Sequence, residues 1–231
     1  MSRKHTPEPS FAAVAPLAEK RRSRKRAGFF QKMEVSLPPA ALTSGVPLET
    51  CLRKRRTNRA FSDARLMQSE VSQLLWAAQG ISGLGGLRTC PSAGALYPLE
   101  CYLVVANVDG LRPGVYRYDP DRHLLVLTAA GGRNEKLIEC CLDQECAGEG
   151  AVSIIVTGAY KKMTAKFGER GIRLAHMEAG HAAQNVCLQA TALGLGVIAM
   201  GVFDDAALAA ALELPESHQP LYVIIAGRKF V

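Results

Sequence analysis

The order of apolar and polar positions predicts several strands. Apolar runs typical of strands occur at 100–107, 151–157, 196–203 and 221–227. Two shorter runs, 115–118 and 123–127, flank the turn sequence Asp-Pro-Asp and predict a β-hairpin. Gly201 interrupts one of the predicted strands, which indicates that a ligand or another backbone segment comes close there.

Helical periodicity separates these runs. Residues 68–80 carry their apolar side chains on one face and end at a glycine. Residues 170–193 form the longest helical pattern and are apolar on nearly all sides toward their end, so we expect a helix at the core or at an interface. Further helices are expected from Leu48 to Phe61, at 133–145 and after Asp204.

The composition is that of a soluble globular protein. The chain has 231 residues, of which 48% are hydrophobic and 21% charged, so it can bury a core as one large domain or two small ones. No apolar run reaches the roughly 18 residues that a membrane span requires. We therefore expect no membrane span.

The net charge of +7 is concentrated at the N-terminus. Residues 1–32 hold nine of the 28 basic residues and two of the 21 acidic residues, which leaves 19 of each in the rest of the chain. We expect a basic disordered tail over 1–32 and no nucleic-acid-binding surface on the neutral body. A twin-arginine export sequence at Arg21-Arg22 is the alternative, but polar residues and prolines interrupt the apolar run that it needs.

The seven cysteines indicate a reducing compartment. Their number is odd and no two have C-x-x-C spacing, so we expect reduced thiols and a cytoplasmic location. Glu178 and His181 have the spacing of half a di-iron site, but no second such pair exists. We expect no metal and expect Glu178, His181 and Asn185 to satisfy one another or the backbone inside the core.

A dense basic cluster lies at residues 53–59. It contains five of the 19 basic residues of the body within seven positions, and charge this dense is unfavourable unless water or an anion neutralises it. Arginine offers paired planar donors that suit a phosphate, and Thr57 adds a hydroxyl donor. The alternative is a solvated helix end, where cations favour the helix dipole.

The stretch Cys90–Pro98, CPSAGALYP, is the second candidate site. Ser92 is a good helix N-cap, and the small residues that follow it leave backbone N–H groups uncovered. A helix start of this kind lets a flat or anionic ligand approach the backbone. The alternative is an ordinary capping turn between two elements.

Three motifs in chain order resemble those of the FMN-dependent nitroreductase superfamily, in particular its SagB-type dehydrogenase branch. Arg55–Arg59 resembles the R-R-S-x-R of that family, and Pro91–Pro98 resembles its P-S-A-G-A-L-Y-P. Glu178–Gly196 contains its G-H-x-x-Q-N and A-L-G-L-G. The resemblance implies one FMN-binding domain over 33–231, with the tail outside it.

The fold that the resemblance implies is α+β: an α/β/α sandwich with a mixed, mainly antiparallel sheet, built as an intertwined homodimer with FMN at the subunit interface. Carried over by position, Arg55, Thr57 and Arg59 contact the phosphate, the ribityl chain and the pyrimidine edge, with Arg56 beside them. The remaining residues carried over are Pro91, Ser92, Ala93, Gly94 and Ala95 from the partner subunit, Met200 and Gly201 near flavin N5, and Arg228 or Lys229 near the phosphate.

The resemblance also implies an activity. NADH or NADPH would transfer a hydride to the flavin and leave before a small organic acceptor binds, which gives ping-pong kinetics. Azoline-oxidising members carry a Lys-Tyr pair where this chain has Lys166-Phe167, so the hydroxyl is lost and Lys166 remains a candidate base. Alternatives are an azoline-to-azole dehydrogenase acting on a modified peptide, a non-catalytic flavin-binding protein, and a nucleic-acid or membrane-surface partner acting through the tail. The sequence names neither the acceptor nor the preferred nicotinamide cofactor.

Overall fold

The computed structural model describes residues 33–230, so the predicted tail lies outside the described residues. Seven strands form one sheet in the order β1-β4-β3-β2-β5-β7-β6. The strands are β1 Glu34–Ser36, β2 Leu99–Val105, β3 Gly114–Asp119, β4 Leu124–Ala130, β5 Val152–Gly158, β6 Gly196–Met200 and β7 Gln219–Gly227. The helices are α1 Leu48–Lys54, α2 Gln68–Gln79, α3 Asn134–Cys140, α4 Cys146–Glu149, α5 Lys161–Phe167, α6 Arg170–Ala192 and α7 Asp205–Ala211.

The pairing of the strands is antiparallel throughout the sheet. Within residues 33–230, the parallel component expected from the resemblance is reduced to one isolated bridge between Leu66 and Val108. Strand β6 pairs with β7 on one side only, so it forms an edge of the described sheet. An edge strand keeps backbone N–H and C=O groups available to a ligand or another chain.

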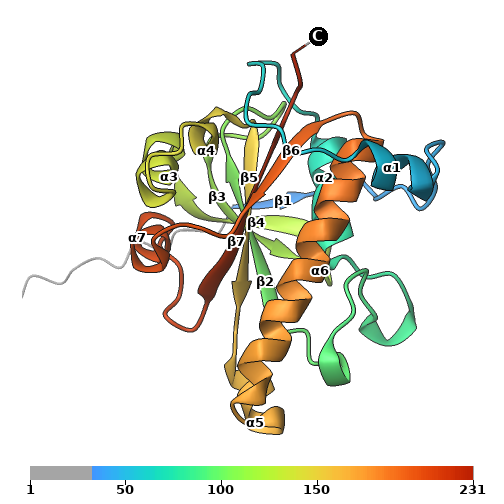
Figure 1. The fold of residues 1–231 in the computed structure, drawn as a ribbon, viewed down its shortest axis with the longest axis vertical. Helices are drawn as coiled ribbons and strands as arrows, with labels where there is room; N and C mark the ends of the chain where they lie inside the picture. The colour runs from blue at the N-terminus through green and yellow to red at the C-terminus, as the bar shows by residue number, and fades with distance from the viewer. Residues whose placement is uncertain (1–32, 231) are drawn as a thin grey trace, which may run out of the picture. The chain divides into compact units, whose positions relative to one another are not determined.

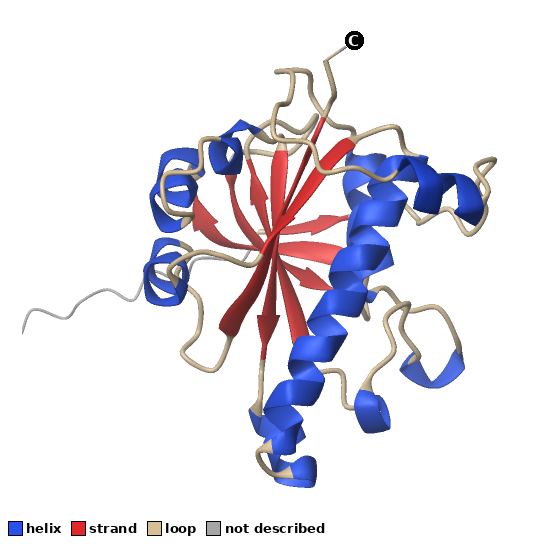
Figure 2. Ribbon diagram, viewed as in Figure 1, coloured by secondary structure: helices blue, strands red, loops and turns tan. Residues whose placement is uncertain are grey.

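Helices cover both faces of the sheet (Figures 1 and 2). Successive side chains of a strand point to opposite faces, so each strand contributes to two cores. In β2, Cys101 and Leu103 pack with residues of α2 and α6, whereas Tyr102 and Val104 pack with residues of α3, α4 and α7. The predicted α/β/α sandwich is confirmed.

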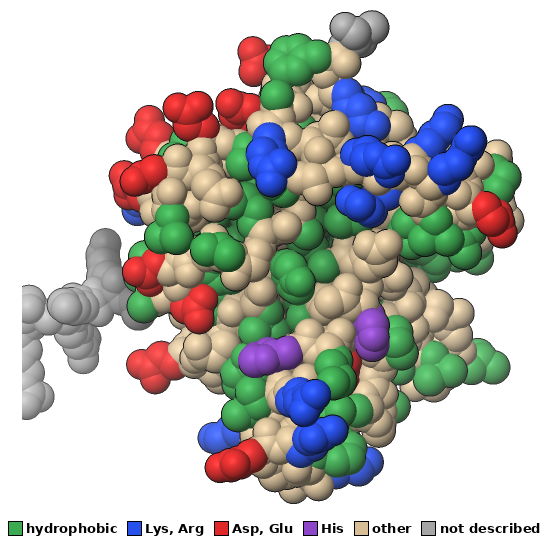
Figure 3. All heavy atoms as spheres, in the orientation of Figure 1, with side chains coloured by type: hydrophobic (Ala, Val, Ile, Leu, Met, Phe, Trp, Pro, Cys, Tyr) green, Lys and Arg blue, Asp and Glu red, His purple; other side chains and the backbone are tan. Residues whose placement is uncertain are grey.

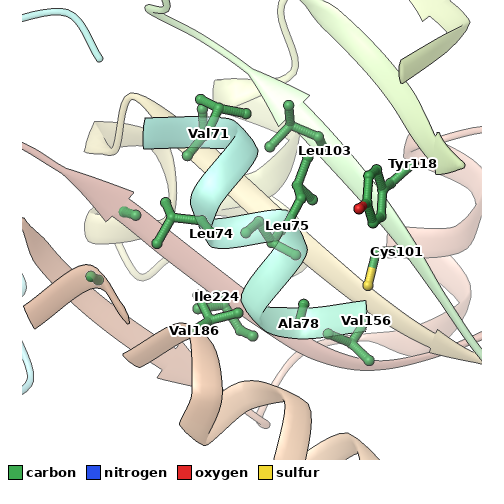
Figure 4. Close-up of a cluster of buried hydrophobic side chains, with 14 of the residues drawn as sticks. Val71, Leu74, Leu75, Ala78, Cys101, Leu103, Tyr118, Val156, Val186 and Ile224 are labelled. Atoms are coloured by element: carbon green, nitrogen blue, oxygen red, sulfur yellow. The ribbon is translucent and has the colours of Figure 1, made fainter. Parts of the chain in front are cut away.

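Helix α2 inserts its apolar face directly into the first of these cores. Val71, Leu74, Leu75 and Ala78 are fully buried at the helical spacing predicted from the sequence. Figure 4 shows them facing side chains from β2, β5, α6 and β7, among them Leu103. Burial of a side chain of this size contributes about 1.5–3 kcal/mol to folding, so α2 fixes one face of the sheet.

Most predicted elements are present. The hairpin β3–β4, the buried strand β5, the long helix α6 and the helix capped by Asp204 are confirmed. The helix expected from Leu48 to Phe61 ends at Lys54, because the basic residues that follow it run along the edge of β6. The helix expected at 133–145 ends at Cys140, and the short elements β1, α4 and α5 were not predicted.

None of the helices in 33–230 is long and apolar enough to cross a bilayer. The seven cysteines are all free and all buried.

Candidate functional site

The basic segment that follows α1 is fastened to the edge strand β6. The backbone N–H of Asn58 donates to the carbonyl of Val197, with 2.9 Å between nitrogen and oxygen. The buried ring of Phe61 packs against Gly196 and Gly227, which are cross-strand partners in β6 and β7. A Cβ at either glycine would lie 3.0–3.1 Å from this ring. The glycines thus make room for the aromatic anchor that holds the basic segment.

The charges of this segment have no carboxylate partner among the described residues. None of the six ion pairs within 33–230 involves Arg53, Lys54, Arg55, Arg56 or Arg59. Figure 3 shows Lys and Arg side chains gathered over α1 and the segment beyond it, while acidic side chains gather over α3 and α4. A basic patch with no internal counterion is suited to bind an anion.

Arg56 and Arg228 are engaged within the protein. Arg56 donates from Nη1 to the carbonyls of Arg53 and Arg55, which curls it back onto its own segment. Arg228 forms a two-pronged ion pair with the buried carboxylate of Glu70, at 2.8 and 2.9 Å. Glu70 also accepts from the N–H of Met67 at the start of α2. Arg228 therefore has a structural partner, and the anion site rests on Arg55 and Arg59.

The CPSAGALYP stretch forms a strained turn instead of the expected helix start. Its helical part is one 3₁₀ turn, Ala93–Ala95, and the Ser92 side chain does not cap it. The Ser92 hydroxyl accepts from the N–H of Tyr97. Gly94, Ala95 and Tyr97 all have positive φ, at 64°, 52° and 47°. Two non-glycine residues in this region cost free energy, and such strain is concentrated at functional sites.

Glu178 holds this turn in place from α6. Its Oε1 accepts from the backbone N–H of Ala93 at 2.8 Å, and the carbonyl of Glu178 accepts from the thiol of Cys90. Burial raises the pKa of this carboxyl, although the bonds from Ala93 and Ser92 partly offset the rise. The backbone N–H of Ala93, which was expected to face a ligand, thus already has a hydrogen-bond acceptor within the chain.

The other two polar residues of this part of α6, His181 and Asn185, lie in different environments. The prediction that Glu178, His181 and Asn185 satisfy one another or the backbone inside the core is right for Asn185, whose amide donates to the carbonyls of Ala77 and Thr89. It is wrong for His181, because that side chain faces solvent. The periodicity of α6 puts position 181 on its open face.

Lys166 and Phe167 lie against the same turn. A Cβ at Gly94 would stand 2.7 Å from the Lys166 ammonium nitrogen and 3.4 Å from the Phe167 ring. The end of α5 and the CPSAGALYP turn, which are distant in sequence, therefore meet in space. Pro91, Gly94 and Ala95 are exposed, so this surface is open to a ligand or to another chain.

The end of β6 has one buried and one open residue. Met200 points into the core with α3, α4 and α7, so only its backbone is available at the edge. Gly201 is exposed, and a Cβ there would meet only the Tyr222 ring, at an ordinary contact distance of 3.7 Å. The fold of this chain alone therefore does not require a glycine at position 201.

The two candidate motifs are far apart within one chain. The charge of Arg55 partly offsets the rise that burial causes in the pKa of the Cys187 thiol, and Ala93 is bonded to Glu178. Both partners belong to α6, in which each residue advances about 1.5 Å, so they are separated by about 14 Å along the helix axis. Figure 1 shows α1 near one end of α6 and the 84–97 loops beside its other half.

A cavity of about 450 Å³, here called the Tyr160 cavity, adjoins Gly201. Its other lining residues are Tyr160, His176, Ala179, Phe203, Asp205, Gln219, Pro220, Leu221 and Tyr222. Sequence reasoning missed it, because its walls come from the residue that precedes α5 and from α6, α7 and β7, and no spacing rule joins them. Only Gly201 was identified beforehand.

A family model and a full-length relative of this chain point to the same family. The model of the nitroreductase family matches residues 52–228. MJ1384 of Methanocaldococcus jannaschii, named as a nitroreductase, is 39% identical over 197 residues, which are 85% of this chain and 97% of that protein.

Two further relatives are named as an operon protein and a processing protein. The trifolitoxin operon protein TfxC of Rhizobium leguminosarum bv. trifolii is 26% identical over 228 residues, covering 92% of this chain and 62% of TfxC. The microcin B17-processing protein McbC of Escherichia coli is 28% identical over 156 residues, covering 61% of this chain and 54% of McbC. The chain thus spans less than two thirds of either relative.

Solved structures share the fold over most of the chain. A crystal structure from Ralstonia eutropha, named as a nitroreductase, has a TM-score of 0.76 at 28% identity and covers 86% of this chain and 90% of its own. One from Anabaena variabilis, also named as a nitroreductase, has a TM-score of 0.77 at 30% identity and covers 86% of this chain and 42% of its own.

Proposed function

Because the chain belongs to the nitroreductase family and is an oxidoreductase, we propose that it binds FMN and carries electrons from NAD(P)H to a small organic acceptor by a ping-pong mechanism. One observation carries the proposal: a basic segment without internal counterions is fastened to the edge strand β6, which ends at the open residue Gly201. The phosphate of FMN matches the first feature and its flat ring matches the second.

The donor chemistry of the residues fits FMN. Arg59 would supply positive charge for the phosphate and Arg55 for the pyrimidine edge, and the Thr57 hydroxyl would supply a neutral donor for the ribityl chain. The available edge of β6, with the backbone of Met200 and Gly201, supplies groups that can pair with the ring. Arg56 flanks the site, while Arg228 is engaged by Glu70 at the start of α2.

We propose a homodimer in which each flavin site takes residues from both chains. The separation of the two motifs along α6 supports this arrangement, since Ser92–Ala95 of one chain would reach the cofactor of the other. Exposed apolar side chains on and near α6 and in the 84–87 loop, namely Ile172, Met177, Leu48, Leu52, Leu84 and Leu87, are suited to such an interface. The buried reduced thiols support a cytoplasmic location.

In this mechanism the protein binds, orients and provides electrostatic stabilisation. FMN, when bound, supplies the hydride chemistry. Arg55 stabilises negative charge at the pyrimidine edge, which favours reduction. Arg59 would hold the phosphate end and Thr57 the ribityl chain, and the edge of β6 would position the ring. The turn at Gly94, kept in shape by Glu178, leaves space against one face of the cofactor.

Titration with FMN tests the role of the basic segment. Arg55→Ala and Arg59→Ala should each weaken FMN binding about 10- to 100-fold, because a hydrogen bond to a charged group contributes about 1.5–3 kcal/mol. Lys136→Ala, which removes an exposed charge from α3, is the matched control and should leave binding unchanged. Initial rates with varied NAD(P)H and acceptor should give parallel double-reciprocal lines. Unchanged FMN binding in both arginine variants would reject the assignment.

A second candidate function is azoline oxidation on a modified peptide. The relatives TfxC and McbC favour it, as does the packing of Lys166 against Gly94. Incubation with a short thiazoline peptide and mass spectrometry distinguishes the two functions. Loss of two hydrogens from the peptide, abolished by Lys166→Ala, would favour this candidate over the reduction of a small acceptor.

A further inference from the structure

Arg88 is a half-buried arginine just before the CPSAGALYP turn, and no carboxylate of residues 33–230 forms an ion pair with it. Its Nη1 atom donates to the side-chain oxygen of Gln79, the last residue of α2, at 2.9 Å. Its Nε atom is buried and has no hydrogen-bond acceptor among the described residues. A buried N–H group without an acceptor is unfavourable and rare in native structures, so Arg88 has a role other than filling space.

The backbone around Arg88 is fixed to the end of α2. Arg88 forms an antiparallel bridge with Ile81 across the 82–87 loop. The N–H of its neighbour Thr89 donates to the carbonyl of Gly80 at 3.0 Å. Since the guanidinium is also bonded to α2, both ends of the arginine side chain are held in place.

The guanidinium lies over the ring of Tyr97, with 4.8 Å between its Cζ atom and the ring centroid. A cation over an aromatic face at this distance is attracted to the ring. Tyr97 is half-buried, has a φ of 47° and donates its N–H to the Ser92 hydroxyl. Arg88 therefore contacts the side chain of a strained residue that closes the turn.

The turn is thus held from two helices. From α6, the Glu178 carboxylate accepts from the N–H of Ala93. From α2, Arg88 packs on Tyr97. We propose that Arg88 is a positioning residue, which clamps Tyr97 and so keeps the strained Ala93–Ala95 segment in the shape that faces the flavin of the partner subunit. This inference rests on the proposed function, which brings a flavin to the turn.

The positive charge of Arg88 belongs to this role. Burial, and then the charge of Glu178, raises the pKa of the Cys90 thiol to about 11, whereas the charge of Arg88 opposes the rise. The field of Arg88 therefore reaches the first residue of the turn. A neutral side chain at position 88 would lose the attraction to the ring, whereas lysine would keep a cation without the planar guanidinium.

The first test needs no cofactor. Hydrogen exchange of the purified chain without added FMN, read by mass spectrometry on peptides that cover 91–98, reports how often the turn opens. Arg88→Met should speed this exchange about 3- to 30-fold, the factor that a cation over an aromatic ring contributes. Arg88→Lys should speed it less. Arg112→Met, at an exposed arginine near the opposite end of β2, is the matched control and should leave it unchanged.

A double-mutant cycle tests whether Arg88 acts through the ring. Tyr97→Phe keeps an aromatic face, whereas Tyr97→Leu removes it. Arg88→Met should therefore speed exchange in the Tyr97→Phe background and have little further effect in the Tyr97→Leu background. Arg88→Lys in the same two backgrounds tests the same contact if Arg88→Met does not fold. Equal effects of the Arg88 substitution in both backgrounds would overturn the proposal.

Titration with FMN connects the turn to the cofactor. The apparent affinity falls with the fraction of chains in which the turn is formed, so Arg88→Met should raise the Kd about 3-fold or more, with partial rescue in Arg88→Lys. Unchanged exchange at 91–98, or faster exchange with an unchanged Kd, would overturn the inference and leave the proposed function intact. A wild-type protein that binds no FMN would instead overturn the proposed function, and with it the role of the turn toward the cofactor.

Discussion

At the scale of single residues, Glu178 connects the long helix to the strained turn beside it. The sequence identified this residue as a polar group inside an apolar helix, but not its partner. That partner, the N–H of Ala93, is 85 positions away in the chain and is brought close only by the packing of the turn on α6. A contact between residues so far apart produces no periodic pattern in the sequence, so the sequence alone did not predict it.

Two substitutions separate the charge of Glu178 from its hydrogen bond. Glu178→Ala leaves the Ala93 N–H unpaired and should lower the free energy of unfolding by about 1–3 kcal/mol. Glu178→Gln keeps an acceptor oxygen and should cost less. Urea unfolding of the wild type and the two variants at neutral pH measures the difference, and equal losses in both variants would contradict the role of the hydrogen bond.

The pH dependence of stability provides an independent check. Because burial raises the pKa of Glu178 above that of an unfolded glutamate, the unfolded chain loses this proton first as the pH rises. The contribution of Glu178 to stability is therefore greatest at acid pH and declines as the pH rises from the ordinary glutamate pKa through the raised one. Glu178→Gln should remove this decline. A wild-type profile retained in the variant would assign the decline to other groups.

At the scale of elements, the sequence predicted interiors better than ends. Helix α2 and strand β5 could be predicted from the pattern of apolar residues, because both are buried and the pattern reflects burial. The end of α1 does not, because the bond from Asn58 to Val197 and the packing of Phe61 draw the basic segment away from the helix. The basic segment, the CPSAGALYP stretch and Gly201 were identified from residue type and pattern, and the resemblance added Met200 and Arg228. The Tyr160 cavity could not be predicted, because it is formed by elements that are distant in sequence.

Gly201 provides a test at the end of strand β6. Gly201→Ala meets no close atom within the chain, so the free energy of unfolding of the apoprotein should change by less than about 0.5 kcal/mol. If the flavin ring lies against this residue, the added methyl group should weaken FMN binding about 10-fold or more. Gly132→Ala, at another open glycine beyond β4, is the control. Equal FMN affinity in the two variants would remove Gly201 from the site.

At the scale of the whole molecule, the proposed sharing of sites between two chains predicts complementation. Arg59→Ala disables the phosphate end, and a bulky residue in Gly94→Trp disables the opposite turn. Homodimers of either variant should fail to bind FMN tightly. Mixed dimers formed by unfolding and refolding the two variants together should recover one intact site each. No recovery, with mixed dimers present by mass spectrometry, would show that each site is built by one chain.

The most direct measurement is the visible absorption spectrum of the purified, desalted protein, followed by heat release and identification of any flavin. The account predicts a yellow protein that releases FMN in an amount equal to the number of sites. A colourless protein that also fails to take up added FMN would contradict the central claim, and the fold and the family would remain without the proposed chemistry.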